Sequence, residues 1–367
     1  MEKSISPAAV SKCVASTPLT DELRQISAVQ QLQPRIDSLV EFYVSRALHR
    51  VGIDATQFCS LSDVQARRDS LRSLGVPPSK SWWIQLLASI SQSAVTDPAI
   101  DLHTDISALK YLQDRLPFYS IELSLIERVG QRLDELIKSE GTSAIIQTLF
   151  CDDVMSRWYT NSVTYNVFNK LSRETIRFVL SQIDRPLRVI EVGAGTGGLT
   201  ANLLDLFPSD STDYAFTDVG AFFLRSGRRR FADYSFVNFR RLDLEQPCHE
   251  QGFQVGSCDL VIANNVIHDT KNVAFTLRNL ADTLAPGGML LMVELTDPQS
   301  WWHMCFGSLE GWWRFKSDPS DSRTDLMLLK REQWIKRLDQ SGFVETTVIS
   351  DQLPSDFANR LFLSQTA

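Results

Sequence analysis

Two different hydrophobic patterns divide the chain near residue 180. From residue 19 to about residue 180, apolar side chains recur every three or four positions, which is the spacing of amphipathic helices. In the segment RIDSLVEFYVSRALHRVGI, apolar residues stand at positions 36, 39, 40, 43, 44, 47 and 51, and we predict a helix that ends near Gly52. After about residue 185 the period changes. We therefore predict a helical cap domain over residues 1–180 and a second domain over residues 181–367.

The second domain has the pattern of an α/β fold. Helical stretches such as LTANLLDLF and VAFTLRNLADTLA separate the apolar runs RVIEVG, YAFTDV, FVNFRRLD, CDLVIANN and GMLLMVEL. This alternation is typical of βαβ units, which form a parallel sheet with helices on both faces. Two more strands, FVETTVIS and RLFLSQT, follow the last helix and can pair as a hairpin.

Composition narrows the class of protein. The chain has 367 residues, of which 43% are hydrophobic and 22% charged, as in ordinary globular proteins. A formal net charge of -7 disfavours nucleic acid or an anionic membrane as a partner. The six cysteines form no CxxC pair, and no apolar run approaches the roughly 20 residues of a membrane helix. We expect a cytoplasmic protein with reduced thiols, no membrane contact and no metal site.

The first strand of the second domain runs into a glycine-rich turn, RVIEVGAGTGGLT. Glycines at the end of a strand let backbone N–H groups approach a ligand without interference from a Cβ atom. Gly193, Gly195 and Gly198 satisfy the dinucleotide pattern GxGxxG, and Asp218 follows 20 residues after the last of them. The same turn, written as ExGxGxG from Glu191, suits S-adenosylmethionine. The turn alone leaves both cofactors open.

Polar residues after the later strands favour S-adenosylmethionine. Asp218 ends the second strand, where a carboxylate can bind ribose, and Asp243 follows the third, where it can accept from an adenine amino group. A solvated loop position is the alternative for Asp243. A dehydrogenase is expected to have a second mononucleotide-binding half. The candidate cofactor-binding residues are Glu191, Gly193, Ala194, Gly195, Asp218, Leu242, Asp243, Asn264 and Asn265.

Taken in order, these motifs resemble class I S-adenosylmethionine-dependent methyltransferases over roughly residues 185–367. The resemblance implies a seven-stranded Rossmann-like sheet of order 3-2-1-4-5-7-6 with one antiparallel strand. More narrowly, IEVGAGTGGLT, YAFTDVGAFFL, ANNVIHDT and FGSLEGWWRF are similar to the C-methyltransferase domains of fungal iterative polyketide synthases, above all the non-reducing, citrinin-type group. The helical region leading into LFCDDVMSRWYTNSVTYNVFNKL resembles the cap of those domains.

The family implies a reaction and partners. It transfers a methyl group from S-adenosylmethionine, with S-adenosylhomocysteine as product, to the α-carbon of a β-ketoacyl thioester. An acyl carrier protein holds that polyketide on its phosphopantetheine, so the carrier and the other domains of a multifunctional synthase are the expected partners in secondary metabolite biosynthesis. The basic stretch RSGRRRF can dock an anionic carrier or be a solvated helix face. The alternatives are a small-molecule O-methyltransferase and a non-catalytic, methyltransferase-like structural domain.

Removal of the α-proton needs a base, and His268 follows the fourth strand at the sheet edge where α/β folds bind ligands. A histidine base needs an acceptor on its other ring nitrogen. Glu294 ends the fifth strand, which should neighbour the fourth, so the two residues can meet although they are 26 positions apart. The family's His–Glu pair matches these positions, which implies His268 as base and Glu294 as its orienting partner. Alternatively, His268 merely precedes a helix cap at Asp269 or Thr270, and Asp269 is the fallback base.

Four aromatic residues are candidates for contact with the substrate. Tyr159 and Tyr165 can face the cofactor or the acyl chain, or they can pack the cap. Trp312 and Trp313 belong to the tryptophan-rich segment SWWHMCFGSLEGWWRFKSD, which we expect to form a loop. Such a loop can roof a channel for an apolar chain, or its rings can fix the cap domain, and we expect both roles.

Overall fold

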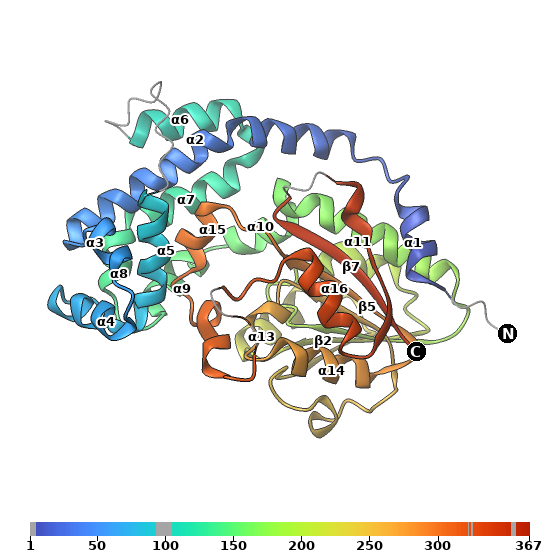
Figure 1. Ribbon diagram of the computed structural model, residues 1–367. Helices are drawn as coiled ribbons and strands as arrows, with labels where there is room; N and C mark the ends of the chain where they lie inside the picture. Colours follow the sequence, from blue (N-terminus) through green and yellow to red (C-terminus); the bar gives the residue numbers. More distant parts are fainter. Residues whose placement is uncertain (1–4, 93–104, 322, 324–325, 354–356) are drawn as a thin grey trace. The chain divides into compact units, whose positions relative to one another are not determined.

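A computed structural model describes residues 5–92, 105–321, 323, 326–353 and 357–367 (Figure 1). The chain folds into two compact units. The helical unit comprises residues 20–158 and 298–313, and the sheet unit comprises the N-terminal segment up to Leu19 with residues 159–297 and 314–367.

The described part of the helical unit consists of helices, as the sequence period predicts. Its elements are α2 (Thr20–Val51), α3 (Ala55–Ser60), α4 (Val64–Ser73), η1 (Pro78–Lys80), α5 (Ser81–Gln92), α6 (Asp105–Arg115), η2 (Pro117–Tyr119), α7 (Ser120–Gln131), α8 (Leu133–Lys138), α9 (Ser143–Phe150), α10 (Val154–Asn161), α15 (Ser300–Phe306) and η6 (Glu310–Ser317). Of α10 and η6, only the residues up to Trp158 and Trp313, respectively, belong to this unit. The predicted apolar stripe of α2 is buried from Ile36 to Val51. The helix ends there because Gly52 adopts the left-handed φ of 87° that glycine tolerates.

The sheet unit contains the predicted seven-stranded sheet in the order β3-β2-β1-β4-β5-β7-β6. Its strands are β1 (Leu187–Val192), β2 (Thr212–Asp218), β3 (Val237–Arg241), β4 (Cys258–Asn264), β5 (Leu284–Leu295), β6 (Phe343–Val348) and β7 (Asn359–Thr366). The first five strands pair in parallel, whereas β7 runs antiparallel to both β5 and β6. The predicted class I methyltransferase fold and the C-terminal hairpin are thus confirmed.

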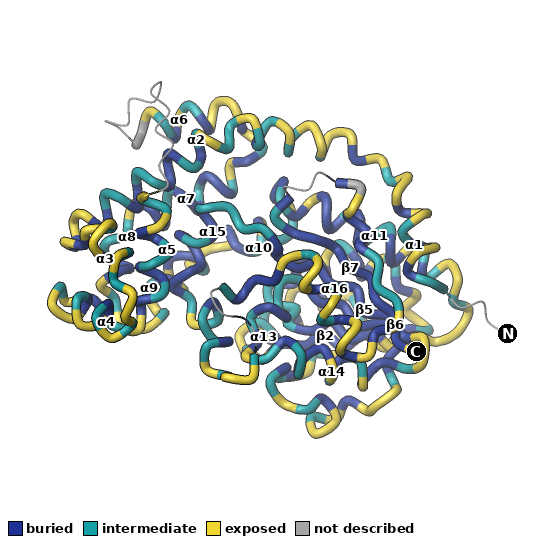
Figure 2. Tube along the Cα trace, in the orientation of Figure 1, coloured by how far each residue is buried: buried dark blue, intermediate teal, exposed yellow. Residues whose placement is uncertain are grey.

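Helices cover both faces of this sheet. They are α1 (Pro7–Val14), α11 (Val163–Ser181), α12 (Thr200–Leu203), α13 (Ala221–Arg230), α14 (Val273–Thr283) and α16 (Arg331–Asp339), with the short turns η3 (Leu204–Leu206), η4 (Cys248–Gln251), η5 (Ile267–Asp269) and η7 (Ile349–Gln352). Neighbouring residues of β1 point to opposite faces: Ile190 joins the apolar cluster with α14 and α16, whereas Glu191 bonds to Thr200 of α12. The central strands are buried, while α14 and α16 carry exposed outer positions (Figure 2).

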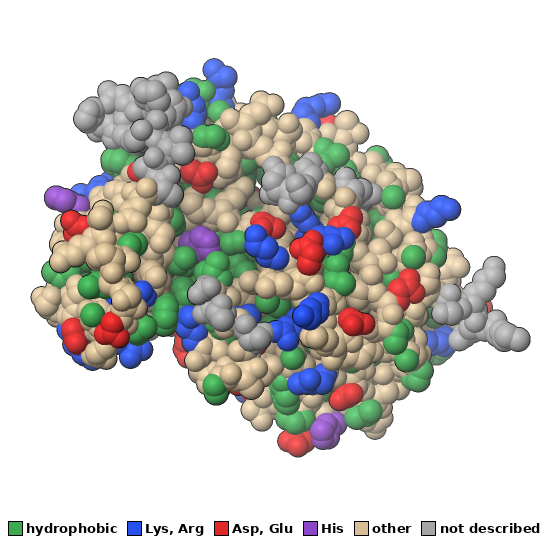
Figure 3. Space-filling model, viewed as in Figure 1, with side chains coloured by type: hydrophobic (Ala, Val, Ile, Leu, Met, Phe, Trp, Pro, Cys, Tyr) green, Lys and Arg blue, Asp and Glu red, His purple; other side chains and the backbone are tan. Residues whose placement is uncertain are grey.

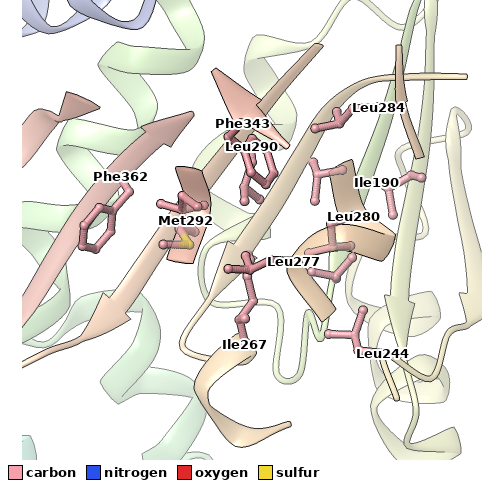
Figure 4. Packing of buried hydrophobic residues seen from close by; sticks show 14 of the residues in the cluster. Ile190, Leu244, Ile267, Leu277, Leu280, Leu284, Leu290, Met292, Phe343 and Phe362 are labelled. Carbon is pink, nitrogen blue, oxygen red and sulfur yellow. The ribbon is translucent and has the colours of Figure 1, made fainter. Parts of the chain in front are cut away.

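An apolar cluster of the sheet unit fixes the segment that follows β4. Leu277 and Leu280 of α14 pack with Leu290 and Met292 of β5, and Ile267 of η5 belongs to the same cluster (Figure 4). Ile267 is 0% exposed. Burying such a side chain stabilises the fold by about 2 kcal/mol. The residue next to it, His268, is therefore attached to a well-packed anchor.

The two units are not separated at the single boundary near residue 180 that the hydrophobic pattern predicts. Helix α11 packs against β7 and α12, and α1 packs against α11 and β6, so both lie in the sheet unit. Helix α15 packs instead against α2, α5 and α7 of the helical unit. The change of hydrophobic period marks where strands begin, whereas the limits of a unit depend on which apolar faces bury one another.

Two surface features bear on partners. Acidic and basic side chains intermingle on the face shown in Figure 3. Among the residues that the structure describes, no helix is both long enough and apolar enough to cross a bilayer.

Candidate active site

The glycine-rich turn after β1 has the backbone that its sequence predicts. Gly193 and Gly195 both have a φ of 55°, a left-handed value that disfavours side chains. A Cβ atom on Gly193 would lie 2.2 Å from Cγ2 of Val266, so this position has no room for one. A Cβ atom on Gly195 would meet nothing nearer than the carbonyl of Gly193, 3.8 Å away. The turn therefore packs tightly at Gly193 and has room for a Cβ atom at Gly195.

Neighbouring strands brace this turn. The N–H of Ala194 donates to the carbonyl of Thr217 at 2.9 Å, and the N–H of Gly195 donates to Oδ2 of Asp218 at 3.0 Å. The other oxygen of Asp218 accepts from the N–H of Gly220 at 2.7 Å. Burial raises the pKa of this carboxyl, and the two N–H donors act against that rise. Asp218 thus stands at the turn, where the sequence predicts the ribose-binding acid.

Glu191 lies beneath the turn with its carboxylate engaged inside the protein. Oε2 accepts from the hydroxyl of Tyr214 at 2.6 Å and from the hydroxyl of Thr200 at 2.7 Å. Burial raises the pKa of Glu191 to about 7, against the lowering effect of these two hydrogen bonds. Its carboxylate links β1, β2 and α12, and its predicted role in cofactor binding stays a prediction.

The residues after β3 form a braced corner at the same edge of the sheet. Leu242 is buried, and its N–H donates to the carbonyl of Asp218 at 3.2 Å. The half-buried Asp243 receives its own brace from Gln251, whose Oε1 accepts the Asp243 N–H at 2.8 Å. One carboxylate oxygen of Asp243 accepts the N–H of Glu245 at 3.0 Å. The corner holds Asp243 next to the edge where Asp218 ends β2.

Two asparagines and two tyrosines meet at the end of β4. Asn265 has a φ of 51°, the single positive value among described residues other than glycine. Its Nδ2 donates to the hydroxyl of Tyr165 at 3.0 Å and to Oδ1 of Asn264 at 3.1 Å. The rings of Tyr165 and Tyr159 lie 4.8 Å apart. Burial, with a smaller effect from Asp269, raises the pKa of Tyr159 to about 12, so this phenol stays protonated.

The predicted contact between His268 and Glu294 is present. Nδ1 of His268 is hydrogen-bonded to Oε2 of Glu294, and Oε1 of Glu294 accepts the N–H of Ile267 at 2.9 Å. Both side chains are buried, with 8% and 0% exposed. Burial by itself lowers the pKa of His268, but the charge and the hydrogen bond of Glu294 outweigh it and raise the pKa above 6.5. A glutamate that binds Nδ1 leaves Nε2 as the ring atom that can accept a proton.

The segment after His268 does not form the cap that the alternative interpretation required. Helix α14 begins at Val273, and its N-cap is Asn272, whose side chain accepts from the N–H of Phe275 at 3.0 Å. The hydroxyl of Thr270 donates to the carbonyl of Ile267 at 2.8 Å and so closes η5. Neither Asp269 nor Thr270 caps α14.

Trp312 and Trp313 lie in the helical unit rather than with the residues above. The expected loop forms α15 and η6 instead. Trp312 packs against Phe306 with ring centroids 6.4 Å apart, and Trp313 stacks on Trp82 at the same distance. The packing role expected for these rings is present, and their contact with a substrate stays a prediction.

The sequence did not predict two arginine contacts at this edge of the sheet. Arg230, in the basic stretch of α13, donates to the carbonyl of Thr196 in the glycine-rich turn at 2.7 Å, so it supports the turn. The buried Arg323 donates to the carbonyl of His268 at 2.6 Å. Neither contact has a sequence signal, because any residue type supplies a backbone carbonyl. Among the described residues, no group of three or more His, Cys, Asp or Glu side chains could hold a metal ion.

The strand order, the glycine-rich turn and the polar residues along one edge define a class I methyltransferase domain. Residues 190–290 match a family model described as a methyltransferase domain. In sequence, compactin diketide synthase mlcB of Penicillium citrinum is 33% identical over 268 residues, which are 71% of this chain and 10% of that synthase. The chain thus spans about a tenth of the length of this curated relative.

Solved structures give the same result over nearly the whole chain. The CurJ carbon methyltransferase superposes with a TM-score of 0.85 at 27% identity, covering 99% of this chain and 100% of that one. The citrinin polyketide synthase CMeT domain has a TM-score of 0.80 at 22% identity, covering 98% of each chain. The predicted resemblance to the C-methyltransferase domains of polyketide synthases is confirmed, and the chain contains a methyltransferase domain.

Proposed function

We propose that this protein uses S-adenosylmethionine to methylate the α-carbon of a β-ketoacyl thioester carried by an acyl carrier protein. The observation that carries the proposal is the buried His268–Glu294 pair, because carbon methylation needs a base for the α-proton. The pair follows β4 and ends β5, at the edge of the sheet that also holds the glycine-rich turn. The relatives are synthases of polyketides, which supports other synthase domains as partners.

The residues of the turn suit S-adenosylmethionine. Gly195 has room for a further atom beside it, and Oδ1 of Asn265 is buried without a hydrogen-bond partner among the described residues. A buried acceptor without a partner is costly, so a ligand that donates to it would be favoured. Gly193, Ala194 and Gly195 would hold the amino-acid end, and Asp218 with Leu242 and Asp243 would hold the nucleoside. When bound, the cofactor supplies an electrophilic methyl group.

The chain's own residues carry the proton transfer. Nε2 of His268 takes the α-proton, and the electron pair of the C–H bond becomes the enolate of the β-ketothioester. Glu294 holds Nδ1–H in the tautomer that leaves Nε2 free, and its charge stabilises the imidazolium that forms. The hydrogen bond to Ile267 keeps this carboxylate in place at 2.9 Å. Tyr165 bonds to Asn265 and packs against Tyr159, and the two phenols would donate to the substrate's oxygen atoms.

The proposal is tested by incubating the protein with S-adenosylmethionine and a β-ketoacyl thioester on phosphopantetheine. We expect a mass gain of one methyl group, placed on the α-carbon by fragmentation. A matched substrate with two methyl groups already on that carbon has no α-proton and should gain nothing.

Two results would contradict the proposal. Methylation of a phenol with no reaction of the thioester would indicate an O-methyltransferase. Failure to bind S-adenosylhomocysteine in calorimetry would indicate a structural domain.

A further inference from the structure

Arg323 is a buried cation beside the base segment. Its side chain is 1% exposed, and it forms an ion pair with Asp321, 5% exposed, in which Nε lies 2.8 Å from Oδ1. Burying a guanidinium is unfavourable unless the charge is paired and its N–H groups are bonded. Arg323 also lies over the ring of Phe315, with Cζ 5.0 Å from the centroid. The N–H groups of this buried guanidinium therefore need hydrogen-bond acceptors inside the protein.

Four backbone carbonyls occupy this guanidinium. Nη1 donates to His268 at 2.6 Å and to Met327 at 3.1 Å. Nη2 donates to Thr270 at 2.6 Å and to Lys271 at 3.2 Å. Three of these acceptors belong to the four residues that begin with His268, so one side chain holds the backbone of the whole segment.

The segment is therefore held from both ends. On its N-terminal side, Glu294 binds the N–H of Ile267 and the ring of His268. On its C-terminal side, Arg323 binds the carbonyls, and Asp321 accepts the N–H of Val273 at 3.2 Å. Glu294 alone fixes the ring nitrogen but not the carbonyl side of the turn. Both attachments together determine where Nε2 of His268 lies.

We propose that Arg323 is a positioning residue for the methyl transfer: it holds residues 268–271 so that the His268 imidazole keeps its place against Glu294. This inference rests on the proposed function, because it takes His268 as the base.

The charge of Arg323 also affects the protonation of His268. Glu294 on β5 and Asp269 in η5 raise the pKa of His268, whereas Arg323 lowers it. Glu245 and Arg314 act in opposite directions on Asp269. A base must be uncharged to accept a proton, so a cation near the ring keeps more of it in the productive form at a given pH. A neutral hydrogen-bond donor could bind the carbonyls but would not do this.

Two substitutions separate holding from charge. Arg323→Met removes both, and Arg323→Lys keeps the charge while one ammonium cannot reach all of these carbonyls at their separate positions. Arg331→Met is the matched control, because it removes an arginine that forms a surface ion pair with Asp351 in the same unit. Each variant is assayed for kcat and KM on the β-ketoacyl thioester and for S-adenosylhomocysteine affinity. The His268 titration is followed by NMR with labelled histidine, its resonance being assigned by its absence in His268→Ala.

We expect Arg323→Met to lower kcat about 10- to 100-fold, as loss of a supporting hydrogen-bond partner commonly does. Its His268 titration should move to higher pH, while S-adenosylhomocysteine affinity stays within about twofold. Arg323→Lys should keep the titration near that of the wild type and lower kcat less. Arg331→Met should match the wild type in every measurement.

Several results would overturn the inference. The first is that Arg323→Met keeps the kcat and the His268 titration of the wild type. The second is that kcat falls only in proportion to the amount of folded protein, while the His268 titration does not move. If Arg323→Met does not fold, a wild-type kcat in Arg323→Lys overturns the positioning role. If the wild type itself does not methylate the thioester, the proposed function fails, whereas the NMR titration still tests the effect of Arg323 on His268.

Discussion

Glu191 and Glu294 are two buried glutamates near the same edge of one sheet, and they differ in their partners. Glu191 on β1 is 2% exposed and accepts from the hydroxyls of Tyr214 and Thr200. Glu294 on β5 is 0% exposed and binds an imidazole and a backbone N–H. The sequence places both at the ends of apolar strands, so the strand pattern alone does not separate their roles.

The difference shows how a partner changes the role of a buried carboxylate. Neutral hydroxyls leave much of the cost of burial in place, and the pKa of Glu191 rises to about 7. Beside an imidazole, the charge of Glu294 instead raises the pKa of His268. Glu191 links β1, β2 and α12 beneath the glycine-rich turn, whereas Glu294 binds the imidazole that we propose as the base.

The largest effect is expected at the histidine itself. His268→Ala removes the proposed proton acceptor, and methylation of the thioester should fall by about 10²- to 10⁴-fold. S-adenosylhomocysteine affinity should be kept, because the glycine-rich turn is untouched. Turnover and calorimetry measure the two effects, and His249→Ala, an exposed histidine of the same unit, is the control. Near-normal turnover in His268→Ala would remove this residue from the mechanism.

Glu294→Gln should slow the reaction less, by roughly 10- to 100-fold, because the imidazole remains but loses its charged partner. The charge of Glu294 raises the pKa of His268 and burial lowers it, so removal of the charge should lower this pKa. The rate of the wild type should rise with pH through a midpoint above 6.5, and that midpoint should move to lower pH in the variant. An unmoved midpoint in the pH profile of kcat would contradict the coupling.

The glycine-rich turn tests the cofactor side of the comparison. In Gly195→Ala the new methyl group enters open space, so the fold should persist while the φ of 55° and the lost room weaken S-adenosylhomocysteine binding by about tenfold. In Gly193→Ala the methyl group meets Val266, and the thermal midpoint should also fall. Calorimetry and thermal unfolding separate the two outcomes. Unchanged affinity in Gly195→Ala would mean that the ligand lies elsewhere.

The sequence predicts those parts of the site that depend on local pattern or on strand order. Closely spaced glycines indicate the left-handed turn directly, because few other residues adopt that backbone. His268 and Glu294 could be paired because the strands that they follow and end are neighbours. The whole strand order came from the family resemblance, since periodicity locates strands without ordering them.

The rest depends on packing that no local pattern encodes. Arg323 is 55 positions from His268 and reaches its backbone carbonyl, an acceptor that carries no residue identity. Glu191 fits a cofactor motif, yet strand alternation turns its carboxylate toward α12, where Thr200 and Tyr214 receive it. Trp312 packs in the helical unit because α15 and η6 bury their apolar faces there.

The smallest effect is expected at Glu191 and concerns stability. The folded protein protonates this carboxyl below about pH 7, whereas an ordinary glutamate is protonated only below 4.5. Between these values the folded state binds the extra proton, so the free energy of unfolding should fall as pH rises, by roughly 1 kcal/mol per pH unit, and level off above pH 7. Glu191→Gln has no such proton and should lose this part of the slope.

Urea unfolding at pH 5.5 and 7.5 measures that slope, and Glu250→Gln, at an exposed position of the same unit, serves as control. The Gln oxygen can still accept from Tyr214 and Thr200, so the variant should fold. An equal slope in the wild type and Glu191→Gln would mean that this carboxylate keeps its charge when buried. The contrast with Glu294 would then lie only in which groups each carboxylate binds.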